Sequence, residues 1–340
     1  MVTRLIAPLA VFGAVLVAMV ALNNGATTPP ALSAGGDART TAARADKLLT
    51  RARETGDATL YARAERAVDA ALRQDPGEVV ALNAAATLAG LRHDFLGQLR
   101  YGRRALRAEP ELASPLTAIF DGQIELGRYG DAARTAQRLV NSKPSLPAYA
   151  RVSYWRELNG DPEGAMRAMR FAASAGGSPQ SSAYVRALLG DLELSLGRLG
   201  AARAAYRDAL RDVPDFPQAL TGLARLRSAG GDLDGAAALL RRSTQRLALT
   251  TSLTLLGETE SAAGRARAGR RHIAAARAVH AADRAGGGYP DAEAVLFETN
   301  HGSRTRAVRL GRRVYARAPS IRSADALGWA LTRAGRTSAG

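Results

Sequence analysis

The sequence contains no cysteine, few aromatic residues and almost no lysine. Without cysteine the chain has no disulfide, no thiolate zinc site, no cysteine nucleophile and no lipoprotein anchor. Aromatic residues account for 5% of the chain, and alanine and leucine are the commonest members of its 46% hydrophobic fraction. Both residues favour helices, so the composition predicts an all-α protein.

Positive charge comes almost entirely from arginine. Lys47 and Lys143 are the only lysines, although the formal net charge is +16. A solvated basic surface or a GC-rich genome explains this excess, and a nucleic-acid partner remains open.

Sequence motifs of catalysis are also missing. The chain has no glycine loop ending in Gly-Lys-Ser or Gly-Lys-Thr, and no Gly-x-Ser-x-Gly turn. Asp121 and Glu125 are four residues apart, but a solvated helix face explains them better than an acid/base pair. The histidines are too scattered for a metal site, and they are His93, His272, His280 and His301. We therefore expect no enzyme activity, no catalytic residue, no metal and no cofactor.

A long apolar run lies near the amino terminus. Leu5 to Leu22 are 18 consecutive uncharged, mostly apolar residues behind the basic start MVTR. This length predicts a signal-anchor or transmembrane helix over residues 1–22, and residues 23–40, with Pro29-Pro30, are predicted to be a flexible linker. Charge asymmetry places the rest on the extracytoplasmic side of a membrane. Small residues around Ala31-Leu32-Ser33 leave cleavage open, in which case the protein is secreted.

Prolines and glycines recur with one period along the rest of the chain. Pro76, Pro110 and Pro144 are each 34 residues apart, and Pro214 and Pro319 continue the series with small insertions. Glycine ends a helix in a left-handed conformation, and proline cannot continue one, so each period contains two helices. The glycine series is Gly127, Gly160, Gly197, Gly231, Gly264, Gly302 and Gly335.

These marks resemble those of the tetratricopeptide repeat family, and the chain is similar to bacterial members with an N-terminal membrane segment. Residues 181–214 match best, through Leu189-Gly190, Gly197, Ala202, Tyr206, Ala209 and Pro214. The resemblance implies a right-handed α-solenoid of stacked antiparallel helix pairs, plus one N-terminal apolar helix. About eight and a half repeats are expected over residues 41–337. Unrelated helical hairpins or another solenoid class remain the alternative.

Two stretches interrupt the strict spacing. Residues 174–182 and 281–290 are predicted to be loops, and a bend between sub-arrays is expected near the second. The last unit is half a repeat, with Leu327, Trp329 and Leu331 on one helix. Its apolar face predicts either a truncated chain or a self-association surface.

In the family that this chain resembles, the first helix of each pair lines a concave groove. Carboxylates outnumber arginines at the positions so implied, while many arginines fall on second helices. The partner-binding residues implied for the groove are Asn83, Asp121, Glu125, Tyr154, Glu157, Tyr184, Asp191, Arg225, Glu258 and Tyr289.

This partition favours a protein or peptide partner, with basic segments as a suitable ligand. The predicted function is a non-catalytic interaction scaffold, tethered to a membrane through its N-terminal helix. The alternative is a nucleic-acid-binding repeat protein that uses its arginine-rich outer surface. The groove does not favour nucleic acid, because phosphates require cations there.

Overall fold

The computed structural model describes residues 36–55 and 59–336, which contain seventeen helices and no strand. In chain order the helices are α2 (Gly36–Thr55), α3 (Thr59–Gln74), α4 (Val79–Leu91), α5 (Phe95–Ala108), α6 (Ala113–Glu125), α7 (Tyr129–Ser142), α8 (Leu146–Leu158), α9 (Pro162–Ser174), α10 (Pro179–Ser195), α11 (Leu199–Asp212), α12 (Pro217–Ala229), α13 (Leu233–Arg246), α14 (Thr250–Ala262), α15 (Ala266–Ala285), α16 (Ala292–His301), α17 (Arg304–Arg317) and α18 (Ile321–Arg333).

The turns form where the glycines and prolines predict them. Gly197 ends the first helix of its pair with φ +72°, and Gly127, Gly160, Gly231, Gly264 and Gly335 do likewise. Gly302 keeps a negative φ, and in the α4–α5 turn His93 takes the left-handed conformation instead. Each of the five serial prolines lies between a second helix and the next first helix. The chain is therefore a run of antiparallel helix pairs.

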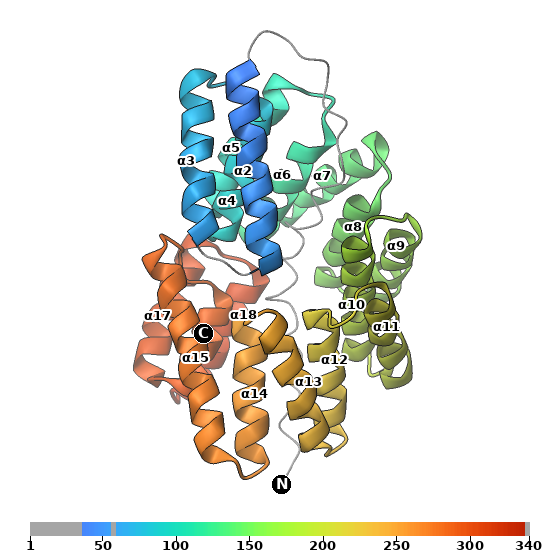
Figure 1. The fold of residues 1–340 in the computed structure, drawn as a ribbon, viewed down its shortest axis with the longest axis vertical. Coiled ribbons are helices and arrows are strands. Elements are labelled where there is room, and N and C mark those ends of the chain that lie inside the picture. The colour runs from blue at the N-terminus through green and yellow to red at the C-terminus, as the bar shows by residue number, and fades with distance from the viewer. Residues whose placement is uncertain (1–35, 56–58, 337–340) are drawn as a thin grey trace.

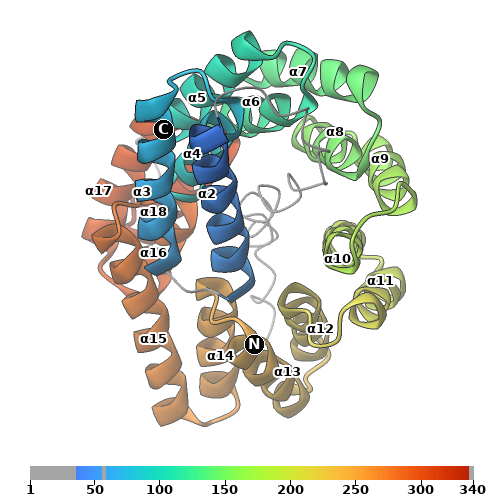
Figure 2. The same ribbon diagram turned by 45° about the horizontal axis from the view of Figure 1, so that its top comes forward.

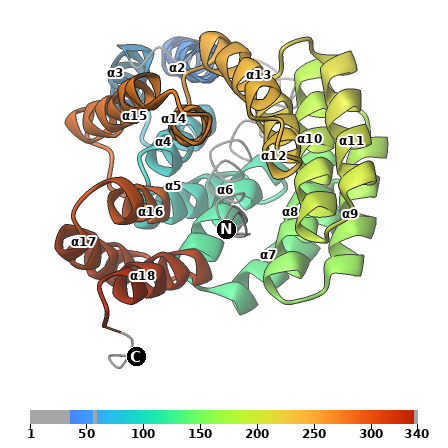
Figure 3. The same cartoon turned by 90° about the horizontal axis from the view of Figure 1, so that it is seen from below.

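The pairs stack in chain order, and this confirms the predicted all-α, tetratricopeptide-like solenoid for the described residues. In Figures 2 and 3, α8, α10, α12 and α14 lie on the inner side of a ring, while α9, α11 and α13 lie outside. An aromatic side chain of α11 packs between two first helices, α10 and α12. The buried ring of Tyr206 fits against Gly190 of its own repeat and Gly222 of the next.

The two ends of the described array meet. In Figures 1 and 2, α17 and α18 lie next to the first repeats, and Figure 2 shows α16 beside them. Ala318 joins an apolar cluster with Phe95, Leu99, Ile119 and Leu126. The Ile321 amide donates a hydrogen bond to the Tyr129 hydroxyl (2.6 Å), and the Tyr289 amide donates to the Arg92 carbonyl (2.9 Å). The solenoid thus closes on itself.

Three element boundaries differ from the sequence prediction. α10 begins at Pro179, so the predicted loop over 174–182 is shorter. α2 begins at Gly36, five residues before the expected start of the repeats. α15 extends to Ala285, so the predicted loop over 281–290 is shorter. The alanine-rich stretch after His272 contains no helix-breaking residue before Gly286, which explains the extension.

The predicted localisation is corrected. Within residues 36–55 and 59–336, no helix is both long and apolar enough to cross a membrane. Even the two longest helices, α2 and α15, carry arginines along their length. The described residues therefore give no support to the prediction of a membrane-anchored protein with its repeats on the extracytoplasmic side. The predicted anchor at Leu5 to Leu22 and residues 23–35 of the linker lie outside the described residues.

Candidate functional site

A buried ion pair joins α6 to α8. Arg151 Nε donates to Asp121 Oδ1 at 2.9 Å, and Nη2 donates to Oδ2 at 2.7 Å. The two side chains are 0% and 2% exposed. Burial raises the pKa of Asp121, and the charge of Arg151 opposes that rise. The groove prediction included Asp121 but missed this counter-ion.

A second carboxylate on α6 is neutralised from the far end of the chain. Arg322, in the first turn of α18, donates from Nη1 to Glu125 Oε1 at 3.0 Å. Tyr154 on α8 is also buried, and desolvation raises its pKa well above the usual value. Glu125 therefore belongs to the closure of the ring.

Asp191 on α10 has two partners. The Tyr206 hydroxyl donates to its Oδ1 at 2.7 Å, and Arg225 Nη1 lies 3.7 Å from the same oxygen. Burial raises the pKa of Asp191 to about 6, against the lowering effect of Arg225 and of the hydrogen bond. Tyr184, two turns earlier on α10, is buried, and its pKa is raised well above the usual value by desolvation and then by Asp191.

Glu157 differs from these carboxylates. It lies near the end of α8 and makes no ion pair or side-chain hydrogen bond with any described residue. Burial, followed by the negative charge of Asp191, raises the pKa of Glu157 to about 8. Near neutral pH this side chain therefore holds a proton that a nearby cation would displace.

The remaining predicted groove residues lie apart from that cluster. Asn83 Nδ2 donates to Ser114 Oγ at 3.2 Å, while its buried Oδ1 has no hydrogen-bond partner within the described part of the chain. Glu258 on α14 lies 2.9 Å from His301 Nε2. Tyr289 lies on the segment before α16 and not on a first helix.

The ten predicted residues thus fall into one cluster and three outliers. Asp121, Glu125, Tyr154, Glu157, Tyr184, Asp191 and Arg225 come together on α6, α8, α10 and α12. Whether they bind a partner stays a prediction. No group of His, Asp and Glu in residues 36–55 and 59–336 has the arrangement of a metal site.

Sequence reasoning missed two arginines, for different reasons. Arg151 corresponds to Ala118 when α6 and α8 are aligned by their ends, and Ala118 is not one of the predicted groove positions, so the repeat pattern gave no signal for it. Arg322 comes from α18 and reaches Glu125 across 197 residues. Such a contact depends on the accumulated curvature of the whole array, which no local pattern contains.

Comparison with known proteins supports the repeat family. A model described as tetratricopeptide repeat matches residues 159–214 and 187–248. No curated protein matches the chain. These comparisons do not support the predicted bacterial origin.

Solved structures support the fold. The chain is similar to one in the crystal structure of the APC/C hetero-tetramer Cut9–Hcn1, with 16% identity, a TM-score of 0.54, and coverage of 84% of this chain and 55% of that one. It is also similar to the human IFIT1 dimer with m7Gppp-AAAA, with 14% identity, a TM-score of 0.56, and coverage of 82% and 64%. The chain therefore spans less than two thirds of the length of these relatives.

Proposed function

We propose that this tetratricopeptide-like repeat protein is a non-catalytic scaffold that binds protein or peptide partners along the inner side of its ring, and that it needs no cofactor. Stacked helix pairs provide one continuous surface on which an extended segment makes many contacts. The first helices supply that inner side (Figure 2). Protein–protein interaction is the use to which such scaffolds are suited.

One observation carries the choice of a basic ligand. Asp121, Glu125, Asp191 and Glu258 each lie within 4 Å of an arginine or histidine nitrogen. Glu157 has no cationic partner among the described residues, and its pKa is raised to about 8. A lysine or arginine of a partner would supply the missing charge and favour the carboxylate form. The inner face is thus less acidic than the sequence suggested, and Glu157 is the predicted acidic groove residue that has no cationic partner among the described residues.

The predicted residues take distinct roles in this proposal. Glu157 contacts the basic residue of the partner, and Asp191 with Arg225 flanks it. Asp121, Glu125, Tyr154 and Tyr184 hold α6, α8 and α10 in position from inside. Asn83, Glu258 and Tyr289 would contact other parts of a long partner.

A peptide-display selection on the full chain tests the proposal. Random peptides are selected on the wild-type protein, and each enriched peptide is titrated against Glu157→Lys and against Glu111→Lys. Glu111 is an exposed carboxylate without a partner among the described residues, so it controls for total charge. We expect one class of enriched peptides to contain lysine or arginine and to lose at least about tenfold in affinity with Glu157→Lys but not with Glu111→Lys. Failure to enrich any such basic peptide, or equal responses of the basic peptides to both variants, would contradict it.

Nucleic-acid binding through the outer arginines is the second candidate. The human IFIT1 structure, with its AAAA-containing ligand, gives that candidate a precedent within the fold only. Several outer arginines already have carboxylate partners, including Arg198 with Glu163 and Arg242 with Asp215. Steeply salt-dependent retention of the full chain on single-stranded RNA would favour this candidate.

Self-association through α18, where Trp329 and Ile321 are exposed, is tested by sedimentation.

A further inference from the structure

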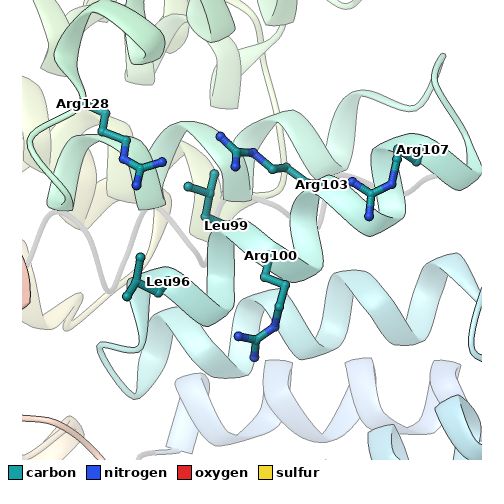
Figure 4. Close-up of a pocket in the computed structure, with 6 residues that line it drawn as sticks. All are labelled: Leu96, Leu99, Arg100, Arg103, Arg107 and Arg128. Atoms are coloured by element: carbon teal, nitrogen blue, oxygen red, sulfur yellow. The ribbon is translucent and has the colours of Figure 1, made fainter.

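A pocket on α5 is lined by two leucines and four arginines (Figure 4). Three of the arginines are on α5, and the fourth lies at the start of α7. Leu96, Leu99, Arg100, Arg103, Arg107 and Arg128 line this pocket of about 220 Å³. The guanidinium groups of Arg103 and Arg128 lie on either side of Leu99 (Figure 4). No acidic residue lines the pocket. None of the four arginines forms an ion pair with a described residue.

Arg128 lacks, within the described part of the chain, the ion-pair partner that arginines at the same position have in other repeats. It is the residue that precedes α7, and its side chain makes no capping hydrogen bond. A cation is unfavourable there, because the amino end of a helix carries partial positive charge. Arg198 and Arg265 stand at the same position before α11 and α15. Each has an ion-pair partner, Glu163 at 2.7 Å and Asp234 at 2.5 Å.

Those two partners also share one position. Glu163 and Asp234 are each the second residue of the preceding second helix, α9 and α13. The second residue of α5, which is the preceding second helix for Arg128, is Leu96, and it is 50% exposed. An exposed leucine thus replaces the carboxylate that neutralises the equivalent arginines. The pocket lacks a negative charge that its own repeat pattern supplies elsewhere.

A second pocket, at the equivalent position of a later repeat, has the negative charge that the pocket on α5 lacks. It lies between α11, α12 and α13, and its lining includes Arg203, Arg207, Arg227 and Asp232. When α5 is aligned with α11, Arg103 corresponds to Arg207 and Arg128 to Asp232. Asp232 pairs with Arg227 at 2.8 Å and caps α13. That pocket contains its own carboxylate, whereas the pocket on α5 does not.

We propose that the pocket on α5 and α7 is a second binding site, on the outer surface, for an acidic protein segment that also carries an apolar side chain. Carboxylates of the ligand pair with Arg103 and Arg128, as Glu163 and Asp234 pair with the equivalent arginines. The apolar side chain covers Leu96 and Leu99. Burying exposed leucine while neutralising clustered guanidinium groups favours such a segment on both counts.

The lining favours a protein segment over nucleic acid. Single-stranded nucleic acid binds through a charged track combined with aromatic side chains on which bases stack. No aromatic residue lines the pocket, and its floor is leucine. The volume of about 220 Å³ is below the roughly 300–1,000 Å³ typical of small-molecule sites, so it fits one side chain of a larger partner.

Fluorescence anisotropy with the full chain tests the site. The probe is a labelled amphipathic peptide of about 16 residues with glutamates around a single leucine. Comparison probes are the same peptide with glutamine for glutamate and an oligothymidylate of similar length.

Leu96→Glu supplies the missing carboxylate from within the chain, and Leu96→Gln is its neutral match. Arg103→Glu is compared with Arg207→Glu, which makes the same charge change at the equivalent position. Circular dichroism verifies the fold of each variant. If Arg103→Glu does not fold, Arg103→Gln replaces it as a milder substitution.

We expect the acidic peptide to bind the wild type, and Leu96→Glu and Arg103→Glu to weaken it by at least about tenfold. Leu96→Gln and Arg207→Glu should change the affinity by less than about threefold. Failure of the wild type to bind the peptide would overturn the proposal. So would equal losses with Arg103→Glu and Arg207→Glu, which indicate a diffuse basic surface, or tighter binding of the oligothymidylate through the same residues. None of these results depends on Glu157 or on the inner face.

Discussion

Arg322 at the start of α18 donates a hydrogen bond to Glu125 at the end of α6, although 197 residues separate them. The side chains are 10% and 7% exposed. Together with the hydrogen bond from the Ile321 amide to Tyr129, this pair closes the array into a ring. A closed array fixes the distance between repeats across the inner side, whereas an open solenoid can flex. The inner surface is therefore held in one shape.

Removal of Arg322 should loosen the closure. Arg322→Ala leaves Glu125 largely buried without its cation, so we expect the opening free energy of the α16–α18 amides to fall by about 2–4 kcal/mol. Hydrogen exchange measured by mass spectrometry reports this change. The control is Arg309→Ala, which removes an exposed arginine of α17. Unchanged protection of α16–α18 would show that the closure does not depend on this pair.

Close packing around Tyr206 should make two glycines irreplaceable. A methyl group on Gly222 or Gly190 would overlap the buried Tyr206 ring. We expect Gly222→Ala to lower the free energy of unfolding by about 1–3 kcal/mol, because the ring cannot move without straining the core. Gly200 lies in the same region with no atom near its Cβ position, so Gly200→Ala should be neutral or stabilise by up to about 1 kcal/mol. Denaturant titrations compare the two, and equal effects would refute the packing argument.

The buried pair Asp121–Arg151 should behave as one unit. Asp121→Leu or Arg151→Met alone buries a charge without this partner, and each should cost about 3–5 kcal/mol. The double variant removes both charges and should cost far less than the sum. A double-mutant cycle by urea denaturation measures the coupling energy. Additive losses would mean that the two charges are stabilised independently.

The raised pKa of Glu157 should make the free protein less stable at alkaline pH. Its folded pKa of about 8 exceeds the ordinary 4.5, so the folded state holds this proton more tightly than the unfolded state does. Stability from this group is therefore present below pH 4.5 and is lost as the pH rises to about 8. Glu157→Gln should match the wild type near pH 4.5 and exceed it by up to a few kcal/mol at about pH 9. Thermal unfolding across this range checks it, and parallel curves would contradict the assigned shift.

Much of the fold follows from the sequence because its determinants are local. Glycine and proline act on their own turns, and a shared period predicts stacking. Gly197 and Pro214 therefore mark real helix ends. The end of α15 was less predictable, because several alanines can extend a helix into an expected loop.

The candidate site was less predictable because charge balance is a property of the assembled ring. Asp121 and Asp191 were correctly placed on first helices, yet their partners come from other helices. Glu125 required a residue from α18. Conversely, the outer pocket is readable from the repeat register, since Leu96 occupies the position of Glu163 and Asp234.

The central claim is that Glu157 is the carboxylate on the inner face that binds a cationic residue of a partner. Isothermal titration of one selected basic peptide into the full chain between about pH 6 and 9 tests it most directly. A bound cation displaces the proton of Glu157. The affinity of the peptide for the wild type should therefore increase as the pH rises, by at most about tenfold per pH unit, and level off above pH 8. Glu157→Gln should bind weakly at every pH. Equal, pH-independent affinity of the wild type and Glu157→Gln would contradict the account.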